Sequence, residues 1–292
     1  MTNQQVSAQI RDLARLFQVN RIPEARALGI RLANTFPNNT HVLSILGAIH
    51  GSLGEFREAE SCYRTLVVFE PQSFQHNCYL GLSLVMQGRL NEALVPFKKM
   101  LQLRPDFAEG HMQMGCLLRD LGHHDLAIGH LREALLLSPA LHDAAIFLAN
   151  ILIFRGQMDE ALRLCDQVLA KIPGHPEALA SKALILEKQG HRDAAWTCLA
   201  PAVAGSVATP NVAIIYAKLA PIYDHASHAK SLLNEILSRA SWSPSQLQEM
   251  HFALGGACDF SQPSAIRKSC FQVSHVASAK SPLLSPQPNR SI

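Results

Sequence analysis

Two clusters of ionisable side chains are the first candidates for chemistry in this chain. One consists of His123, His124, Asp125 and His130, and the other of Asp224, His225 and His228. Imidazole nitrogens and carboxylate oxygens are ligands that Zn²⁺ uses in proteins, so either cluster could hold a metal ion. Polar residues gathered at solvated turns between helices would have the same composition. We favour the turn interpretation and predict no metal site and no cofactor.

Recognisable catalytic motifs are not found in the sequence. There is no glycine-rich phosphate loop, no His-Glu-x-x-His pair and no nucleophile elbow, since Gly51-Ser52-Leu53-Gly54 follows a recurring turn pattern. The seven cysteines include no Cys-x-x-Cys pair, which argues against a zinc or disulfide framework and favours reduced thiols in small internal spaces. We therefore predict no catalytic residues and a protein that is not an enzyme.

The elements that position these residues follow a period of 34 residues. Position 20 of successive units is always alanine: Ala25, Ala59, Ala93, Ala127, Ala161, Ala195 and Ala229. Position 15 holds residue types that tolerate a left-handed backbone: Asn20, Gly54, Gly88, Gly122, Gly156, Gly190 and Asp224. Position 8 is small in six of seven units, and position 32 is proline in the first five. A fixed period of this length predicts a repeat protein.

Each unit has the pattern of two amphipathic helices. Apolar residues at positions 4, 7, 8 and 11 share one helix face, and those at 17, 20, 24 and 27 share a face of a second helix. Small residues at positions 8 and 20 let the two backbones approach closely, and the proline at position 32 stops the second helix. Because one hairpin cannot bury its outer apolar face alone, neighbouring hairpins are expected to stack into a superhelix.

These columns resemble the tetratricopeptide repeat (TPR). The resemblance implies an all-α fold, a right-handed superhelical solenoid of antiparallel helix pairs. We predict seven units, at residues 6–39, 40–73, 74–107, 108–141, 142–175, 176–209 and 210–243. An unpaired helix of an incomplete eighth unit is expected at 244–258.

The segment 259–292 breaks the pattern. Residues 261–292 contain eight serines and four prolines with almost no periodic apolar signal, so we predict a disordered tail. The break comes in the middle of a repeat, which suggests an out-of-frame or truncated end. On that hypothesis the apolar face of Leu247, Met250 and Leu254 is expected to be exposed.

Charge and hydropathy narrow the classes of partner. The formal net charge is +3, but four basic residues and one acidic residue lie in 259–292, so the repeats are neutral. Nucleic acid binding depends on neutralising phosphates, and it is therefore not expected. No apolar run approaches 18 residues, so no membrane partner is predicted. We predict a cytoplasmic protein.

The surface left free by stacking is the predicted binding site. Positions 2, 5, 9 and 12 of the first helices cluster about 130° from the core face, and position 13 borders them. We name this set the first-helix face, and it comprises Cys78, Leu82, Val85, Met86, Met112, Cys116, Arg119, Ile146, Asn150, Ile153, Phe154, Leu184, Ile214 and Lys218. Two interpretations are open: an apolar concave groove for a peptide or domain, or packing between helices in a tightly wound solenoid.

Two functions from different classes remain. The first is a non-catalytic protein–protein interaction scaffold that binds an apolar peptide or domain, because Arg119, Asn150 and Lys218 are too isolated to form the carboxylate clamp of some TPR domains. The second rests on a resemblance of residues 210–217 and 247–255 to the N-terminal repeats of bacterial TPR-containing sulfotransferases. That resemblance implies a recognition region whose catalytic domain is absent from this chain. The partner and the oligomeric state stay open.

Overall fold

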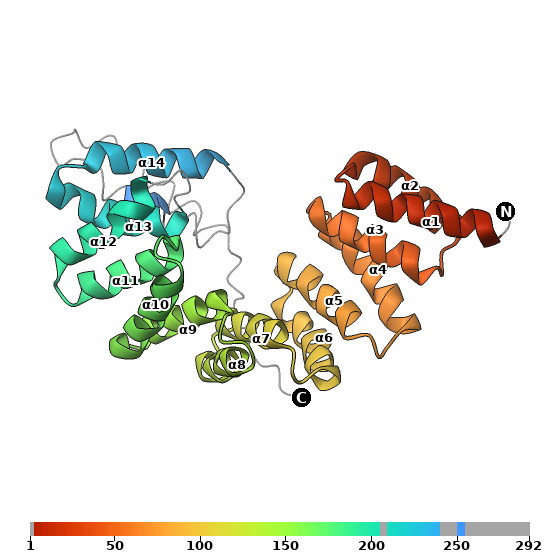
Figure 1. Ribbon diagram of the computed structural model, residues 1–292, viewed down its shortest axis with the longest axis horizontal. Helices are drawn as coiled ribbons and strands as arrows, with labels where there is room; N and C mark the ends of the chain where they lie inside the picture. The colour runs from red at the N-terminus through yellow and green to blue at the C-terminus, as the bar shows by residue number, and fades with distance from the viewer. Residues whose placement is uncertain (1–2, 205–208, 240–249, 255–292) are drawn as a thin grey trace, which may run out of the picture. The chain divides into compact units, whose positions relative to one another are not determined.

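A computed structural model describes residues 3–204, 209–239 and 250–254, and within them the chain is helical, with no strand (Figure 1). The helices are α1 (Asn3–Gln18), α2 (Ile22–Thr35), α3 (Thr40–Ser52), α4 (Phe56–Phe69), α5 (Phe74–Met86), α6 (Leu90–Leu103), α7 (Ala108–Asp120), α8 (His124–Leu137), α9 (His142–Phe154), α10 (Met158–Lys171), α11 (Pro176–Lys188), α12 (Arg192–Ala204), α13 (Pro210–Leu219), the 3₁₀ helix η1 (Ala220–Tyr223) and α14 (Ala226–Arg239). The described residues fall into two compact units, 1–151 and 152–292.

Short connections force consecutive helices to run antiparallel. From α1 to α12, three residues join the helices of a pair and four residues lead to the next pair. The turn residue within each pair has positive φ, from 58° at Asn20 and 60° at Asp224 to 85° at Gly190. Left-handed backbone is inexpensive for glycine and tolerated by Asn and Asp, as the sequence predicted.

The prolines at position 32 end the second helices as predicted. Helices α2, α4, α6, α8 and α10 each stop two residues before one of these prolines. The residue between helix and proline leaves the helical region, with φ −132° at Phe36, because the proline ring disfavours helical backbone in the residue before it. Another proline lies near the end of a first helix: α13 ends at Leu219, and Pro221 lies in η1.

Close packing within each pair explains the small residues. All seven alanines at position 20 are completely buried. A Cβ added to Gly81 would lie 2.3 Å from the Phe97 ring, and one added to Gly47 would lie 2.9 Å from the Tyr63 ring. Position 8 is therefore small because the side chain at position 24 of the partner helix lies directly on it.

Charged contacts join neighbouring pairs in the first unit. The Arg26 guanidinium on α2 binds the Glu55 carboxylate at 2.8 Å, and His50 Nδ1 lies 2.5 Å from the same carboxylate. At the next junction the signs are exchanged: Glu60 on α4 accepts a 2.6 Å hydrogen bond from Arg89. Arg26 and Glu60 both occupy position 21, and Glu55 and Arg89 both occupy position 16. The two junctions therefore use the same contact with opposite polarity.

The Glu60 carboxylate is more enclosed than its partner Arg89 at the second junction, with side chains 10% and 37% exposed. Its side chain accepts hydrogen bonds from Arg64 Nε at 2.7 Å and from Gln87 Nε2 at 2.8 Å in addition to Arg89. Burial alone would raise the pKa of Glu60, but the hydrogen bonds from Gln87, Arg64 and Arg89 outweigh it and hold the pKa below its ordinary value.

The chain after α14 differs from the prediction. Met250 is completely buried and Leu254 is 9% exposed, and both belong to the same apolar cluster as residues of α13 and α14. The expectation that their face is exposed was therefore wrong. The exposed apolar side chain of this short helical stretch is Phe252. Leu247 and the predicted tail 259–292 lie outside the described residues.

Candidate functional site

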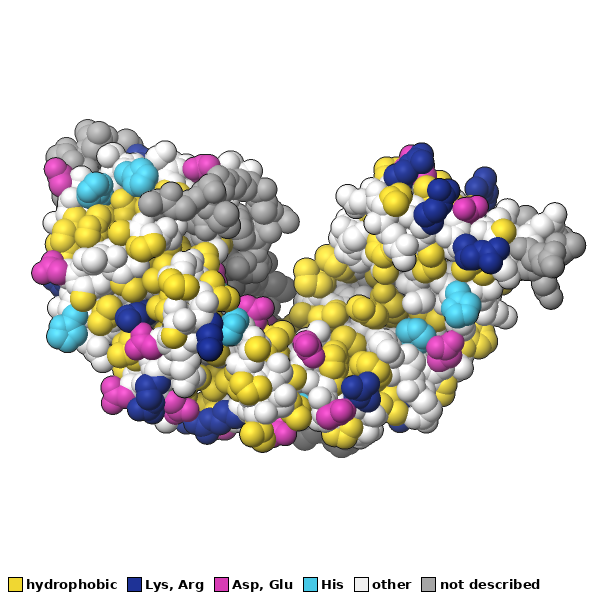
Figure 2. Space-filling view, viewed as in Figure 1, with side chains coloured by type: hydrophobic (Ala, Val, Ile, Leu, Met, Phe, Trp, Pro, Cys, Tyr) yellow, Lys and Arg dark blue, Asp and Glu magenta, His cyan; other side chains and the backbone are white. Residues whose placement is uncertain are grey.

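Part of the predicted first-helix face is accessible in the first unit. Leu82 and Val85 on α5 and Met112 and Cys116 on α7 are half-buried, and Met86 is 59% exposed. Figure 2 shows apolar side chains gathered at the surface around α5. These residues leave an apolar surface on successive first helices that their own repeats do not cover.

Three of the four position-5 residues of this face belong to the core instead, whereas Met112 at the same position is half-buried. Cys78 and Ile146 in the first unit are 6% and 3% exposed, and Ile214 in the second is 8% exposed. The Cys78 thiol donates to the Gln113 side-chain oxygen on the next first helix at 3.1 Å. A projection of one helix cannot reveal the contact of Cys78, because Gln113 comes from the neighbouring pair.

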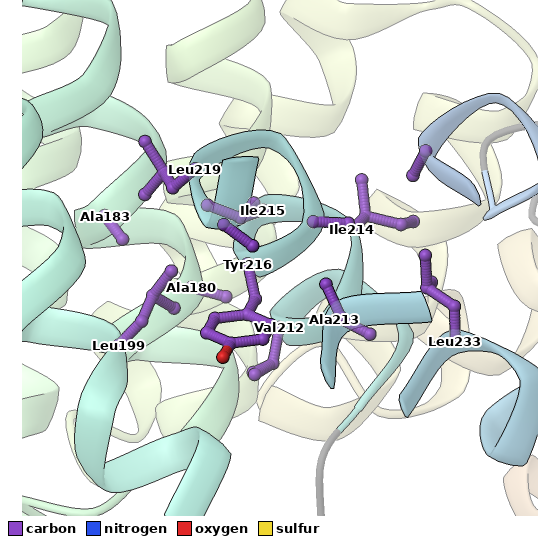
Figure 3. Close-up of a cluster of buried hydrophobic side chains, with 14 of the residues drawn as sticks. Ala180, Ala183, Leu199, Val212, Ala213, Ile214, Ile215, Tyr216, Leu219 and Leu233 are labelled. Carbon is purple, nitrogen blue, oxygen red and sulfur yellow. The ribbon is translucent and has the colours of Figure 1, made fainter. Parts of the chain in front are cut away.

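In the second unit the predicted face is divided between surface and core. Phe154 and Lys218 are exposed and Leu184 is half-buried, whereas Ile153 is 5% exposed. Figure 3 shows Ile214 within the cluster of buried side chains around α13. This cluster includes Leu199, Val212, Ala213, Ile215, Tyr216 and Leu233.

Two aromatic residues beside the face were missed by the sequence analysis. Tyr79 on α5 is 48% exposed and stacks on Tyr63, with ring centroids 5.3 Å apart. On α9, the half-buried Phe147 ring lies 5.3 Å from the Arg119 guanidinium. Both aromatic residues are at position 6, next to the buried position 5, and an aromatic type at that position was the available signal.

Arg119 and the cysteines of this face have defined electrostatic surroundings. Arg119 pairs with Asp120 at 2.9 Å, in addition to its contact with Phe147. Burial raises the pKa of Cys78 and Cys116 to about 11, so both thiols are protonated at neutral pH. The face therefore offers apolar contacts and one half-buried cation, and no activated nucleophile among the residues named here.

The ionisable residues of the two sequence clusters have contacts of their own in the structure. His130 contacts His111 on α7, with the two Nδ1 atoms 3.1 Å apart. In the second unit the His225 ring lies against Trp196, and His228 Nδ1 lies 2.8 Å from the Tyr216 hydroxyl. Within residues 3–204, 209–239 and 250–254, no group of three or more His, Cys, Asp or Glu side chains could hold a metal ion.

Comparison with protein families identifies the repeat. Two family models, each described as tetratricopeptide repeat, match residues 46–106 and 118–185. Residues 46–106 and 118–185 carry tetratricopeptide repeats. A curated relative, the uncharacterized protein y4yS of Sinorhizobium fredii, is 39% identical over 79 residues, which are 27% of this chain and 43% of the relative. The match thus spans less than half the length of that relative.

Solved TPR structures share the fold. A TPR protein of Parabacteroides merdae covers 88% of this chain and 100% of its own, with a TM-score of 0.75 and 16% identity. The type IV pilus biogenesis factor PilW covers 72% and 98%, with a TM-score of 0.63 and 19% identity. YrrB, described as a TPR protein with an unusual peptide-binding site, covers 60% and 90%, with a TM-score of 0.52 and 20% identity. The predicted all-helical solenoid class is confirmed.

Among the described helices, none combines the length and the apolar character that crossing a bilayer requires.

Proposed function

We propose that this TPR chain is a non-catalytic scaffold that binds an apolar segment of a partner protein on the accessible part of its first-helix face. The observation that carries the proposal is the partly exposed apolar row on α5 and α7, formed by Leu82, Val85, Met86, Met112 and Cys116. Such a row on successive repeats suits a short peptide with apolar side chains. The peptide-binding site named for YrrB is consistent with this use of the fold.

The proposed partner is a peptide or protein and not nucleic acid, and the proposed location is the cytoplasm. Arg119 adds one cation beside the apolar row, but it is already engaged by Asp120 and Phe147. Recognition of an acidic chain terminus would require several convergent donors. We therefore propose that apolar burial supplies most of the affinity and that Arg119 orients a carbonyl or carboxylate of the peptide.

The experiment is a peptide selection followed by variants of the face. Peptides are selected on the immobilised wild-type protein from a random library, and their Kd is measured by calorimetry. Met86→Glu combined with Leu82→Glu is expected to weaken binding at least about tenfold, because loss of two apolar contacts costs more than about 1.4 kcal/mol. Ile146, although it belongs to the predicted face, is unsuitable as a test site, since its burial would confound binding with folding.

The matched control is Val95→Glu on α6, which replaces an apolar side chain that is 73% exposed and lies on a second helix. Helicity and the thermal midpoint of each variant are recorded by circular dichroism. Unchanged affinity in the folded Met86 and Leu82 variant, or an equal loss in the Val95 control, would show that the peptides bind elsewhere.

A second candidate function is recognition on behalf of a sulfotransferase catalytic domain. It is supported by the sequence resemblance of residues 210–217 and 247–255. In the structure, Val212 to Ala217 are all buried and form the centre of the second unit's core, so this part of the resemblance has a packing explanation. The encoding DNA, read in all frames after the Cys258 codon, tests this candidate: repeat columns followed by a glycine-rich phosphate loop would support it, and neither feature in any frame would reject it.

A further inference from the structure

Two histidines meet inside the fourth helical pair. His111 on α7 and His130 on α8 have ring centroids 5.2 Å apart, and their Nδ1 atoms are 3.1 Å apart. On the other side of the ring, His111 Nε2 lies 3.0 Å from the backbone oxygen of Pro105. Both histidines are half-buried. The contact thus joins the two helices through one hydrogen bond between imidazoles.

The partners of these rings fix where the protons lie. A carbonyl oxygen only accepts, so His111 Nε2 donates to Pro105. A neutral imidazole carries one proton, and His111 Nδ1 is therefore the acceptor for the Nδ1–H of His130. A proton added to His111 Nδ1 would place two donors opposite each other. It would also place a positive charge beside the neighbouring imidazole.

The surroundings of the pair disfavour positive charge. Burial lowers the pKa of His130 from its ordinary value of 6.5, and the neighbouring His111 lowers it further, whereas Glu133 on the same helix raises it. Two ionisable groups thus act on His130, His111 from α7 and Glu133 from α8. Of these, only Glu133 would stabilise a protonated pair.

We propose that the His111–His130 contact is a pH-sensitive latch that holds α7 against α8 at neutral pH and releases it in mild acid. The contribution to stability is fully present above the unfolded-state pKa of His130 near 6.5 and is lost as pH falls below that value, because the unfolded chain then binds a proton at His130 that the folded chain binds less readily. Exclusion of this proton from the folded chain raises the local opening equilibrium by up to about tenfold per pH unit.

The equivalent contact in other pairs does not titrate in this range. Positions 4 and 23 hold Leu43 and Cys62 in the second pair and Leu179 and Cys198 in the sixth. Burial raises the pKa of Cys62 to about 11, and it also raises the pKa of Cys198. These positions therefore supply a native replacement that keeps the packing and removes the imidazoles.

The test is amide hydrogen exchange of the full chain at several pH values between 7.5 and 5, expressed as protection factors that remove the intrinsic pH dependence. In the wild type, amides of α7 and α8 are expected to lose at least about tenfold protection across this interval. Helices α1 and α2 contain no histidine and serve as the reference within each molecule. The double variant His111→Leu with His130→Cys is expected to keep its protection.

The control variant is His41→Gln, which removes an exposed histidine from α3. It is expected to retain the wild-type pH response of α7 and α8. Equal loss of protection in the double variant would place the response elsewhere, with His76 on α5 as the next candidate because burial also lowers its pKa. Constant protection in the wild type would overturn the proposal directly.

A second arm links the latch to binding and rests on the proposed function. Met112 and Cys116 lie on α7, so release of this helix is expected to weaken the selected peptides as pH falls, in the wild type and not in the double variant. Exchange data that support the latch while peptide affinity stays constant would reject this link only. A failure of peptide binding at every pH would reject the proposed function and leave the exchange result intact.

Discussion

Glycine is found at position 8 where the two helices of a pair approach closely. The Cβ that alanine would add to Gly81 falls 2.3 Å from two carbons of the Phe97 ring, a separation that requires the ring or the backbone to move. We expect Gly81→Ala to lower the free energy of unfolding by about 1–3 kcal/mol through overpacking. Urea denaturation followed by circular dichroism measures this change.

The control for this substitution is another helical glycine of the same chain. Gly129 is in α8, and a Cβ there would meet no atom within 4 Å. Gly129→Ala is therefore expected to stabilise the protein by about 0.5–1 kcal/mol, because alanine restricts the unfolded chain and favours the helix. If both substitutions change stability in the same direction, the close contact with Phe97 is not what selects glycine.

The cysteines give a second prediction at the scale of single residues. Burial raises the pKa of Cys62, Cys78 and Cys116 to about 11, and that of Cys165 to about 12. With Cys258 and Cys270 replaced by serine, we expect the native protein to react with Ellman's reagent at pH 8 at least about 100-fold more slowly than the unfolded protein. Rapid reaction of one thiol under native conditions would identify a site where burial is incomplete.

Residue columns with one local cause were predictable. Alanine at position 20 and a left-handed turn residue at position 15 each follow from one helical hairpin, and both expectations agree with the structure. Cys78 was not predictable as buried, since its contact Gln113 belongs to the next pair. The His111–His130 contact was missed for a different reason: both residues belong to one hairpin, but positions 4 and 23 meet only after that hairpin folds.

At the scale of helices, one carboxylate joins α4 to the turn between α5 and α6. Glu60 is 7% exposed and accepts hydrogen bonds from Gln87, Arg64 and Arg89. We expect Glu60→Gln to destabilise the protein at pH 7 by about 1.5–3 kcal/mol, the usual contribution of hydrogen bonds to a charged group. Glu92→Gln is the matched control: its pKa is lowered mainly by a hydrogen bond from Arg89, but its side chain is exposed, so little change is expected.

The same carboxylate gives this junction an acid limit. Because the folded-state pKa of Glu60 is lowered, its stabilisation is present above the unfolded value of 4.5 and is lost as pH falls through the folded-state pKa. Thermal midpoints between pH 5 and 3 should therefore fall less steeply in Glu60→Gln than in the wild type. Parallel curves for the two proteins would exclude Glu60 as a source of the acid response.

Helix boundaries were predictable where proline and glycine mark them, as at Pro37, Pro71 and Gly88. The segment after α14 was not, because the repeat pattern indicated a helix there without indicating what covers it. In the structure, Met250 and Leu254 bury their side chains with α13 and α14. An apolar helix face in a sequence is therefore not evidence of an exposed surface.

At the scale of the whole molecule, repeats contact mainly their neighbours, so stability is expected to vary along the chain. Trp196 is stacked on Tyr216 and Tyr223 at 5.0 and 4.6 Å, and with Trp242 replaced by phenylalanine its fluorescence reports the second unit alone. We expect Gly81→Ala to shift the circular dichroism transition in urea and to leave the fluorescence midpoint unchanged. Leu199→Ala should instead shift the fluorescence midpoint, because it lowers the free energy of unfolding by about 2–5 kcal/mol.

Coincident shifts of both signals in both variants would show that the two units unfold as one cooperative system.

The fold class was accessible from sequence because the 34-residue period appears in every unit and each copy adds to the same signal. The binding surface was only partly accessible, since it is what remains after neighbours have covered their shares of each first helix.

The alternating polarity of the two charged junctions has a consequence for the order in which the hairpins can assemble. If the α1–α2 hairpin stacked directly on α5–α6, Arg26 would oppose Arg89. If α3–α4 stacked on the same hairpin of another molecule, Glu60 would oppose Glu55. Both mistakes bring like charges together at a partly buried contact, which disfavours skipped hairpins and the stacking of identical hairpins from two molecules. The inversion thus distinguishes the correct neighbour from nearly identical wrong ones, a problem that any chain built from similar repeats faces as it folds.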